Sequence, residues 1–87
     1  MYRYENEREK VFTDDGQRLF LQIRDHVRER LRMSGAVTMG CAISVAKSGD
    51  SWTMLACVDR MVELGELHEI TCPGCAGQDR VFVPMGG

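Results

Sequence analysis

The chain has 87 residues, of which 44% are apolar and 28% are charged, a composition typical of a globular protein and too apolar for a disordered one. This length accommodates one small domain. The formal net charge of -2 argues against a strongly basic nucleic-acid-binding protein. No apolar run approaches the roughly 18 residues that cross a bilayer, and the first ten residues lack the apolar segment of a signal peptide, so we expect a cytoplasmic protein without membrane contact.

The charges are distributed unevenly along the chain. Residues 1–40 carry eight Lys or Arg against seven Asp or Glu, whereas residues 41–87 carry three (Lys47, Arg60 and Arg80) against six, so the second half is acidic. Four cysteines stand at positions 41, 57, 72 and 75. Because no export signal precedes them, we expect reduced thiols rather than a disulfide framework.

The first long element is predicted to be a helix that begins near Thr13 and Asp14. Thr or Asp can cap a helix, and acidic side chains favour its N-terminal end. We expect the helix to end by Ser34 and Gly35. Its arginines are interpreted as a solvated polar face. Residues 1–12 follow neither a helical nor a strand period, so we expect them to form a partly ordered arm.

Two shorter helices are predicted to follow. Thr38 is a suitable cap for a helix that runs to about Lys47. A turn over residues 48–51 then precedes a third helix, over residues 52–64, which carries apolar side chains at helical spacing. Gly65 ends this helix in the position that a left-handed cap usually takes.

After the third helix the apolar period changes from 3.6 to 2. Residues 67–71 and 80–84 are prone to form strands, and residues 72–79 between them are rich in turn formers, which predicts an antiparallel hairpin. Helices and hairpin can bury their apolar faces only against one another, so we expect one α+β domain over residues 13–84. Its predicted core comprises Leu19, Phe20, Ile23, Val27, Leu31, Ile43, Val58, Met61, Val62, Leu67 and Phe82.

Three helices followed by a hairpin is the order of elements in a winged helix-turn-helix, and two segments resemble that family more closely. Residues 58–67 (VDRMVELGEL) resemble the junction between the recognition helix and the first wing strand in bacterial regulators of the MarR type. Residues 78–83 (QDRVFV) are similar to the return strand of that wing. The resemblance covers about residues 38–83 and implies a winged helix associated with double-stranded DNA, such as a small transcriptional or phage or plasmid accessory regulator.

The resemblance also implies a binding surface. The third helix would enter the major groove, and Arg80 on the wing would approach phosphate or the minor groove. By the register of residues 58–60, the groove-facing residues near the helix start are Ser51, Trp52, Thr53, Leu55 and Ala56. Lys47, Gln78 and Arg80 complete the candidate partner-binding set. None of the five groove-facing residues of the third helix is Arg, Lys, Asn or Gln, which make bidentate contacts with bases, so we expect little base readout.

A protein contact is the alternative use of the same surface. Trp52, Met54, Leu55 and Cys57 gather near the start of the third helix, and an exposed Trp with aliphatic neighbours has the composition of an interface anchor. The other possibility for Trp52 is that it folds back onto the core or the wing. A protein partner or a homodimer fits this acidic, apolar surface, whether the chain is an adaptor, a dimerisation module or an inhibitor of a nucleic-acid-binding complex.

The predicted turn contains the one motif that suggests metal chemistry. Cys72-Pro73-Gly74-Cys75 has the form of a zinc knuckle, for which His68 offers a third ligand. A disulfide between the two cysteines and a tight turn with reduced thiols are the alternatives, and we expect the turn, without metal or cofactor. His26 is interpreted as a surface residue. No nucleophile with ordered partners and no phosphate loop is recognisable, so we expect a binding protein rather than an enzyme.

Overall fold

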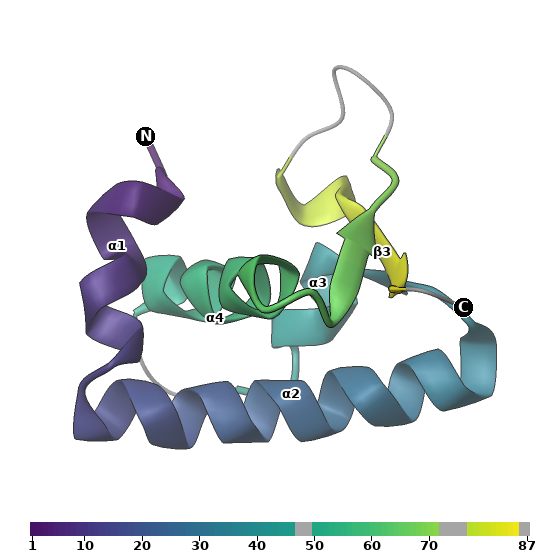
Figure 1. Ribbon diagram of the computed structural model, residues 1–87, viewed down its shortest axis with the longest axis horizontal. Coiled ribbons are helices and arrows are strands. Elements are labelled where there is room, and N and C mark those ends of the chain that lie inside the picture. Colours follow the sequence, from purple (N-terminus) through teal and green to yellow (C-terminus); the bar gives the residue numbers. More distant parts are fainter. Residues whose placement is uncertain (47–49, 72–76, 86–87) are drawn as a thin grey trace.

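The computed structural model describes residues 1–46, 50–71 and 77–85. Over these residues the chain folds into four α-helices, one short 3-10 helix and a three-stranded antiparallel sheet (Figure 1). The α+β class predicted from the sequence is confirmed. Within the described ranges, no helix combines the length and the apolar character that a bilayer-spanning segment requires.

Helix α2 (Asp14–Ser34) is the long base of the molecule (Figure 1). Thr13 caps it by accepting a hydrogen bond from the backbone N–H of Gly16, and it ends at Gly35, whose φ of 76° is left-handed. Both ends therefore lie where the capping residues predicted them. The middle of the helix buries its apolar stripe, in which Ile23 and Val27 are inaccessible to solvent.

Helices α3 (Met39–Ile43) and α4 (Ser51–Glu63) form the pair above α2. Thr38 caps α3 as predicted, but the helix ends earlier than expected. Ser44 directs both its N–H and its hydroxyl to the carbonyl of Cys41, which closes a tight turn in place of further helical hydrogen bonds. Helix α4 begins one residue before the predicted start, and Gly65 beyond it has the predicted left-handed backbone, with φ 79°.

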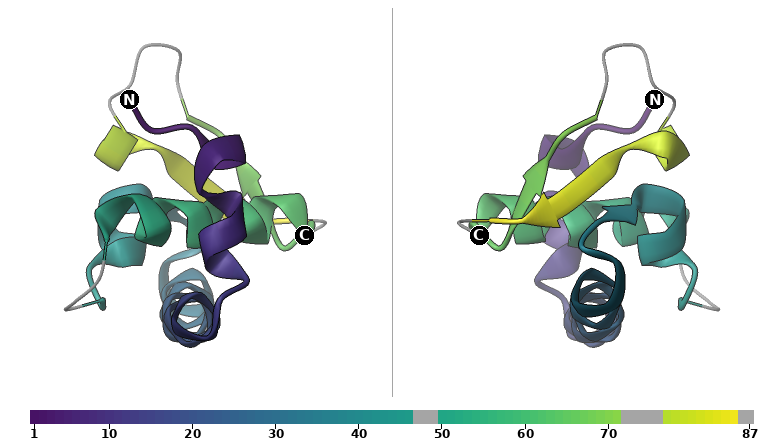
Figure 2. Two further views of the ribbon diagram at one scale, coloured as in Figure 1. Left: turned by 90° about the vertical axis from the view of Figure 1, so that its left-hand side faces the viewer. Right: turned by 90° about the vertical axis from the view of Figure 1, so that its right-hand side faces the viewer.

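The sheet has the order β1-β3-β2 and consists of β1 (Val37–Thr38), β2 (Leu67–Glu69) and β3 (Val81–Pro84). Strands β2 and β3 form the predicted antiparallel hairpin, with Glu69 opposite Phe82. Strand β1 was not predicted, because two residues are too few to display a period. It pairs with β3 and so connects the hairpin to the helices (Figure 2).

The core lies where α2, α4 and the sheet meet. Seven predicted members are buried, namely Phe20, Ile23, Val27, Val58, Met61, Leu67 and Phe82. The other four, Leu19, Leu31, Ile43 and Val62, are partly buried and line its edge. The core extends further than predicted, because Met39 and Met54 join it from the helix pair and Val11 joins it from the N-terminal segment.

That N-terminal segment differs from the prediction. Residues 1–12 do not form a partly ordered arm, because they contain helix α1 (Tyr4–Val11), which stands upright beside α4 (Figures 1 and 2). The helix is mostly polar and has little apolar periodicity of its own. Its contacts with α4 and the complete burial of Val11 hold it in place, which is how tertiary contacts can stabilise a weakly amphipathic helix.

Candidate functional site

The outward side of α4, which was predicted to face a DNA groove, lies largely under α1. Ala56 is completely buried, and Thr53 is only 8% exposed. Both residues were expected on an open surface, and this expectation is corrected. The reason is that α4 packs against both α1 and α2 (Figure 2).

Three side chains of the N-terminal segment, two of them in α1, are hydrogen-bonded to carboxylates of α4. The Tyr2 hydroxyl, just before the helix, donates to Oδ2 of Asp59 at 2.6 Å, and the Tyr4 hydroxyl donates to Oε1 of Glu63 at 2.7 Å. The guanidinium of Arg8 lies 2.9 Å from Oε2 of Glu63. Hydrogen bonds from Tyr4, Arg8 and Arg60 lower the pKa of Glu63 to about 2. These contacts therefore bind a carboxylate that stays ionised at neutral pH.

Two of the same contacts raise the pKa of the tyrosines that make them. Burial and the hydrogen bond to Glu63 raise the pKa of Tyr4 to about 12. Burial, followed by the hydrogen bond to Asp59, also raises the pKa of Tyr2 above its ordinary range. Both phenols are therefore neutral donors across the physiological pH range.

Arg80, directly before β3, is bound by two carboxylates of its own chain. Its Nη2 lies 2.7 Å from Oδ1 of Asp59 and 2.8 Å from Oε1 of Glu69, and its Nε donates to Oε2 of Glu69 at 2.9 Å. The guanidinium also lies over the ring of Phe82, and the side chain is only 21% exposed. The hydrogen bond to Glu69 is the main cause that raises the pKa of Arg80. The predicted phosphate-binding cation thus connects the hairpin of β2 and β3 to α4.

Trp52 is the large apolar side chain that α4 leaves open to solvent near its start. It is 42% exposed, and the edge of its ring meets that of Tyr2, with 6.4 Å between ring centroids and 68° between planes. Ser51 is exposed beside it, and Leu55, one turn further on, is half-buried. We call these four residues, Tyr2, Ser51, Trp52 and Leu55, the Trp52 face. Trp52 is therefore not part of the core that the described residues form.

The remaining predicted site residues lie apart from the Trp52 face or outside the structure. Gln78 is exposed in the 3-10 helix η1 (Gly77–Asp79), which contacts α3. Lys47 lies outside the described residues.

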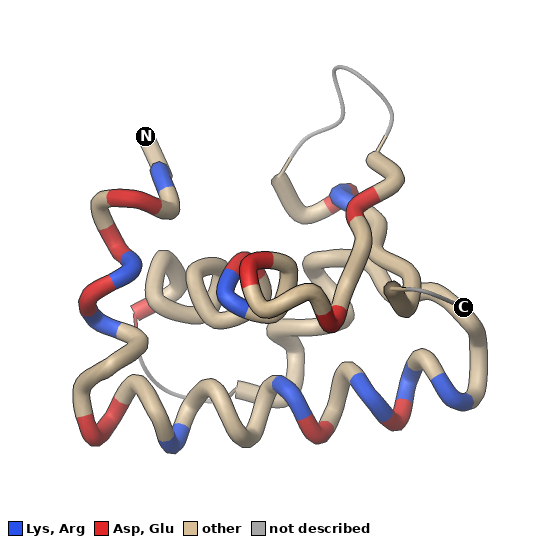
Figure 3. The backbone as a smooth tube through the Cα atoms, in the orientation of Figure 1, with Lys and Arg blue, Asp and Glu red and all other residues tan. Residues whose placement is uncertain are grey.

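Most cations of the described chain are paired with carboxylates. Along α2, arginines are interspersed with Asp and Glu (Figure 3), and its ion pairs include Arg18 with Asp15. Of the Lys and Arg side chains that the structure describes, eight form salt bridges: Arg3, Arg8, Lys10, Arg18, Arg28, Arg32, Arg60 and Arg80. Among these described side chains, only Arg24 and Arg30 form none. A surface balanced in this way attracts polyanions weakly.

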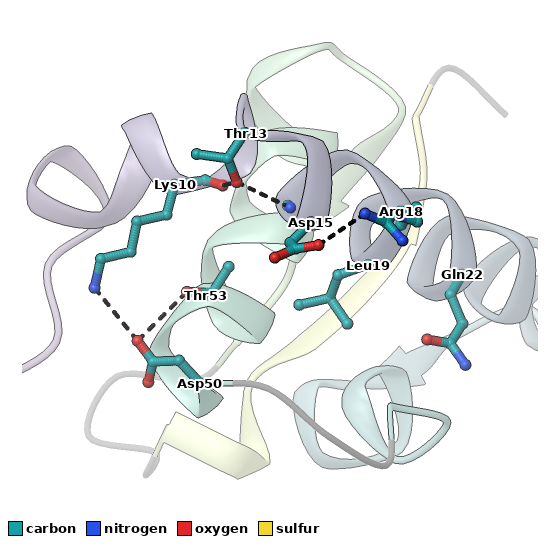
Figure 4. Close-up of a pocket in the computed structure, with 9 residues that line it drawn as sticks. Lys10, Thr13, Asp15, Arg18, Leu19, Gln22, Asp50 and Thr53 are labelled. Carbon is teal, nitrogen blue, oxygen red and sulfur yellow. Dashed lines mark hydrogen bonds and ion pairs between the residues drawn. The ribbon is translucent and has the colours of Figure 1, made fainter.

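An open pocket of about 630 Å³ lies beneath the corner between α1 and α2 (Figure 4). Its charged groups bind one another: the Lys10 ammonium lies 3.3 Å from Asp50, and Arg18 lies 2.9 Å from Asp15. Asp50 also caps α4, and this hydrogen bond from the backbone N–H of Trp52 is the main cause that lowers its pKa. The charges named here are therefore paired with one another across the pocket lining.

The residues that suggested metal chemistry are only partly described. Cys72 and Cys75 lie outside the described residues, and His68 is exposed on β2. Among the residues that the structure describes, no three His, Cys, Asp or Glu side chains are arranged to hold a metal ion. His26, interpreted from the sequence as a surface residue, is half-buried, and its Nε2 lies 3.0 Å from the carbonyl oxygen of Cys41.

Comparison of the chain with models of protein families, with curated proteins and with solved structures finds no match. The functional interpretation therefore depends on the geometry of the chain itself and on the two sequence segments that resemble winged-helix regulators.

Proposed function

We propose that this chain is a small winged-helix module that binds a protein partner through the Trp52 face. The order of elements supports the winged-helix assignment, because the three helices α2, α3 and α4 are followed by the hairpin of β2 and β3. The helix that would correspond to a recognition helix, α4, has much of its outward side against α1. The surface that stays available at its start is aromatic and aliphatic.

The observation that carries this proposal is the exposure of Trp52 beside Tyr2. Tryptophan and tyrosine are enriched among the residues that contribute most to protein interfaces. The edge contact between the two rings restricts their motion before a partner arrives, which lowers the entropy lost on binding. The Trp52 face is therefore suited to enter an apolar pocket of another protein.

The charges around the Trp52 face indicate the chemistry of the partner. The segment from residue 38 to residue 83 carries Lys47, Arg60 and Arg80 against six acidic residues, and Asp50 lies directly before the Trp52 face in the sequence. Five of these six acidic side chains are paired with cations of the same chain. The Trp52 face is therefore complementary mainly to an apolar pocket of a partner.

Site-specific photo-cross-linking tests the proposal. A photoreactive amino acid replaces Trp52 in one variant and Leu21 in the control, whose native side chains are 42% and 45% exposed. We expect a discrete protein adduct from position 52 alone. The purified partner should then bind the wild-type chain and lose about 30-fold in affinity with Trp52→Ala, as is typical of an interface anchor. Identical adducts from both positions, or an unchanged affinity with Trp52→Ala, would contradict the proposal.

Association with double-stranded DNA is the second candidate, and the adjacency of α3, α4 and the wing favours it. It requires α1 to leave α4 and Arg80 to exchange its carboxylates for phosphate. Anisotropy of a labelled mixed-sequence duplex over a salt series tests it, because phosphate contacts give a steep salt dependence. The protein-binding proposal predicts no binding even at low salt. Salt-dependent binding that falls with Arg80→Ala, in a variant shown by circular dichroism to be folded, would favour DNA.

A further inference from the structure

We infer that α1 is an exchangeable element, so that the face of α4 beneath it is an interaction surface for α1 of a second copy of this chain. In the single chain, α1 occupies this face itself, which demonstrates that the two surfaces are complementary. An exchanged dimer would bring the same contacts together between copies. It requires no partner of another kind, so it is independent of the proposal for the Trp52 face.

The corner between α1 and α2 supports the inference, because it depends on one backbone torsion. Phe12 already has helical backbone angles, with φ -88° and ψ -1°. Thr13 alone is extended, with φ -75° and ψ 164°. Rotation of the Thr13 ψ to a helical value would join the two helices into one that spans residues 4–34, which is about 46 Å long. A single hinge residue is therefore enough to carry α1 away from its own α4.

The hydrogen bonds lost at the corner have replacements in the joined helix. In the corner, the Thr13 hydroxyl donates to the carbonyl of Lys10 and accepts from the N–H of Gly16, and the Gln17 side chain donates to the carbonyl of Val11. These contacts satisfy backbone groups at the end of α1 and the start of α2. A continuous helix satisfies the same groups by its own i to i-4 hydrogen bonds.

The contacts between α1 and α4 are likewise kept on exchange. The side-chain hydrogen bonds from Tyr2, Tyr4 and Arg8 to Asp59 and Glu63 re-form between two copies. The equilibrium then depends on the corner and on protein concentration, as in other exchanges of an identical element.

Gly16 controls which of the two forms is available. A Cβ atom at this position in the corner would lie 1.9 Å from the carbonyl oxygen of Lys10 and 2.8 Å from Cα of Val11, both backbone atoms. Alanine therefore does not fit the corner, although it is the better helix former in a continuous helix. Gly16→Ala is thus a substitution that favours the extended, exchangeable form.

Asp14→Pro is the matched substitution in the opposite direction. Asp14 is the first residue of α2, a position where proline is tolerated, and Thr13 already has the extended backbone that a following proline favours. In the joined helix the same proline would be internal and would clash with the carbonyl of Lys10. Asp14→Pro therefore keeps the corner and excludes the continuous helix.

Native mass spectrometry and sedimentation velocity on the full chain test the inference. At one protein concentration we expect Gly16→Ala to be a folded dimer and Asp14→Pro to be a monomer. A folded, monomeric Gly16→Ala chain would overturn the inference, as would an Asp14→Pro chain that dimerises to the same extent.

A second pair of variants keeps the test decisive if Gly16→Ala fails to fold. Glu63→Arg and Arg8→Glu each place like charges between α1 and α4 of one chain, where the native pair is 2.9 Å apart. Exchange between the two variants restores an opposite-charge pair at both interfaces. We therefore expect heterodimers when they are mixed, with one copy isotopically labelled to distinguish them by mass.

Asp14→Pro introduced into both copies is the control, because it forbids exchange without altering the surface charges at positions 8 and 63. We expect it to abolish the heterodimer. A mixture that stays monomeric without the proline, or a heterodimer that persists with it, would overturn the inference. No other protein is present in these measurements, so their failure would leave the proposal for the Trp52 face unaffected.

Discussion

Replacing Arg80 with alanine should loosen the hairpin of β2 and β3 from α4 and lower the stability of the whole domain. The substitution removes one cation from between Asp59 and Glu69, whose carboxylates would then face each other without compensation. It also removes the guanidinium that lies over the ring of Phe82. Strand β3 is the central strand of the sheet, so a disturbance at its start affects both neighbouring strands.

The expected magnitude follows from the position of Arg80 between surface and interior. Exposed ion pairs contribute about 0–1 kcal/mol, whereas removal of one partner from a fully buried pair costs about 3–5 kcal/mol. Arg80 is 21% exposed and has two partners, so we expect a loss of roughly 2 kcal/mol. With the urea dependence of about 1–2 kcal/mol/M that is usual for a small domain, the unfolding midpoint falls by roughly 1–2 M.

Urea unfolding followed by circular dichroism measures this loss. Arg18→Ala is the matched control, because Arg18 pairs only with Asp15 at an exposed site, and we expect no measurable shift. The hydrogen bond from Arg80 is the main cause that lowers the pKa of Glu69 below its ordinary 4.5. A lowered pKa stabilises the fold above the unfolded value and loses this effect as pH falls through the folded value.

The difference in the free energy of unfolding between the wild-type chain and Arg80→Ala should therefore be largest above about pH 5 and should decrease as the pH is lowered further. A shift no larger than that of Arg18→Ala, or a difference that stays constant into the acid range, would refute the reasoning.

Three further predictions concern groups whose environment the structure defines. Phe82→Ala should cost about 3–5 kcal/mol in urea unfolding, because Phe82 is completely buried at the centre of the sheet; a loss below that of Arg80→Ala would contradict this. Cys57 is buried, and burial raises its pKa to about 12. A thiol reagent followed by peptide mapping should therefore modify Cys41 before Cys57, and Cys57 only on unfolding. Equal rates of modification at Cys41 and Cys57 in the folded chain would contradict this prediction. The pKa of Tyr4 is raised to about 12 and that of Tyr2 is raised as well, so their contacts stabilise the fold below pH 10 and are lost as pH rises through the raised values. Absorbance titration should show no tyrosine midpoint near pH 10 until the chain unfolds, whereas one at pH 10 in the folded chain would rule the contacts out.

The elements with strong local signals could be predicted from the sequence. Helix α2 has both a capping residue and a terminal glycine, and its apolar stripe recurs from Leu19 to Leu31, so its bounds were correct. The hairpin was predicted because the apolar period changes from 3.6 to 2 directly after Gly65. These signals arise within a few residues of one another, which is where single-sequence reasoning is strongest.

Helix α1 could not be predicted in this way, because its inward positions are not uniformly apolar. Tyr4, Glu7 and Val11 have helical spacing and turn inward, but Glu7 is charged and is buried beside Lys10. The helical spacing of these three residues was present in the sequence, but the charge of Glu7 meant that they did not form an apolar pattern. The helix depends on its contacts with α4, which a local pattern does not contain.

The candidate site was predicted only as far as it depends on α4 alone. Exposure of Ser51 and Trp52 follows from the helical register and was anticipated. Thr53 and Ala56 lie on the outward side by the same register, but the packing of α4 against α1 and α2 buries them. The partners of Arg80 are 11 and 21 residues away in sequence, so a wing cation that was expected to be open to solvent is instead an internal connection.

Amide hydrogen exchange of the dilute chain, read by mass spectrometry, tests most directly the claim on which this account depends, that α1 lies on the outward side of α4. We predict that amides of residues 7–11 are protected from exchange, and that Glu63→Arg, which removes the partner of Tyr4 and Arg8, speeds their exchange more than that of amides in the middle of α2. Exchange of residues 7–11 at the rate of an unstructured peptide, with α2 and α4 protected, would contradict the account and would leave the outward side of α4 open.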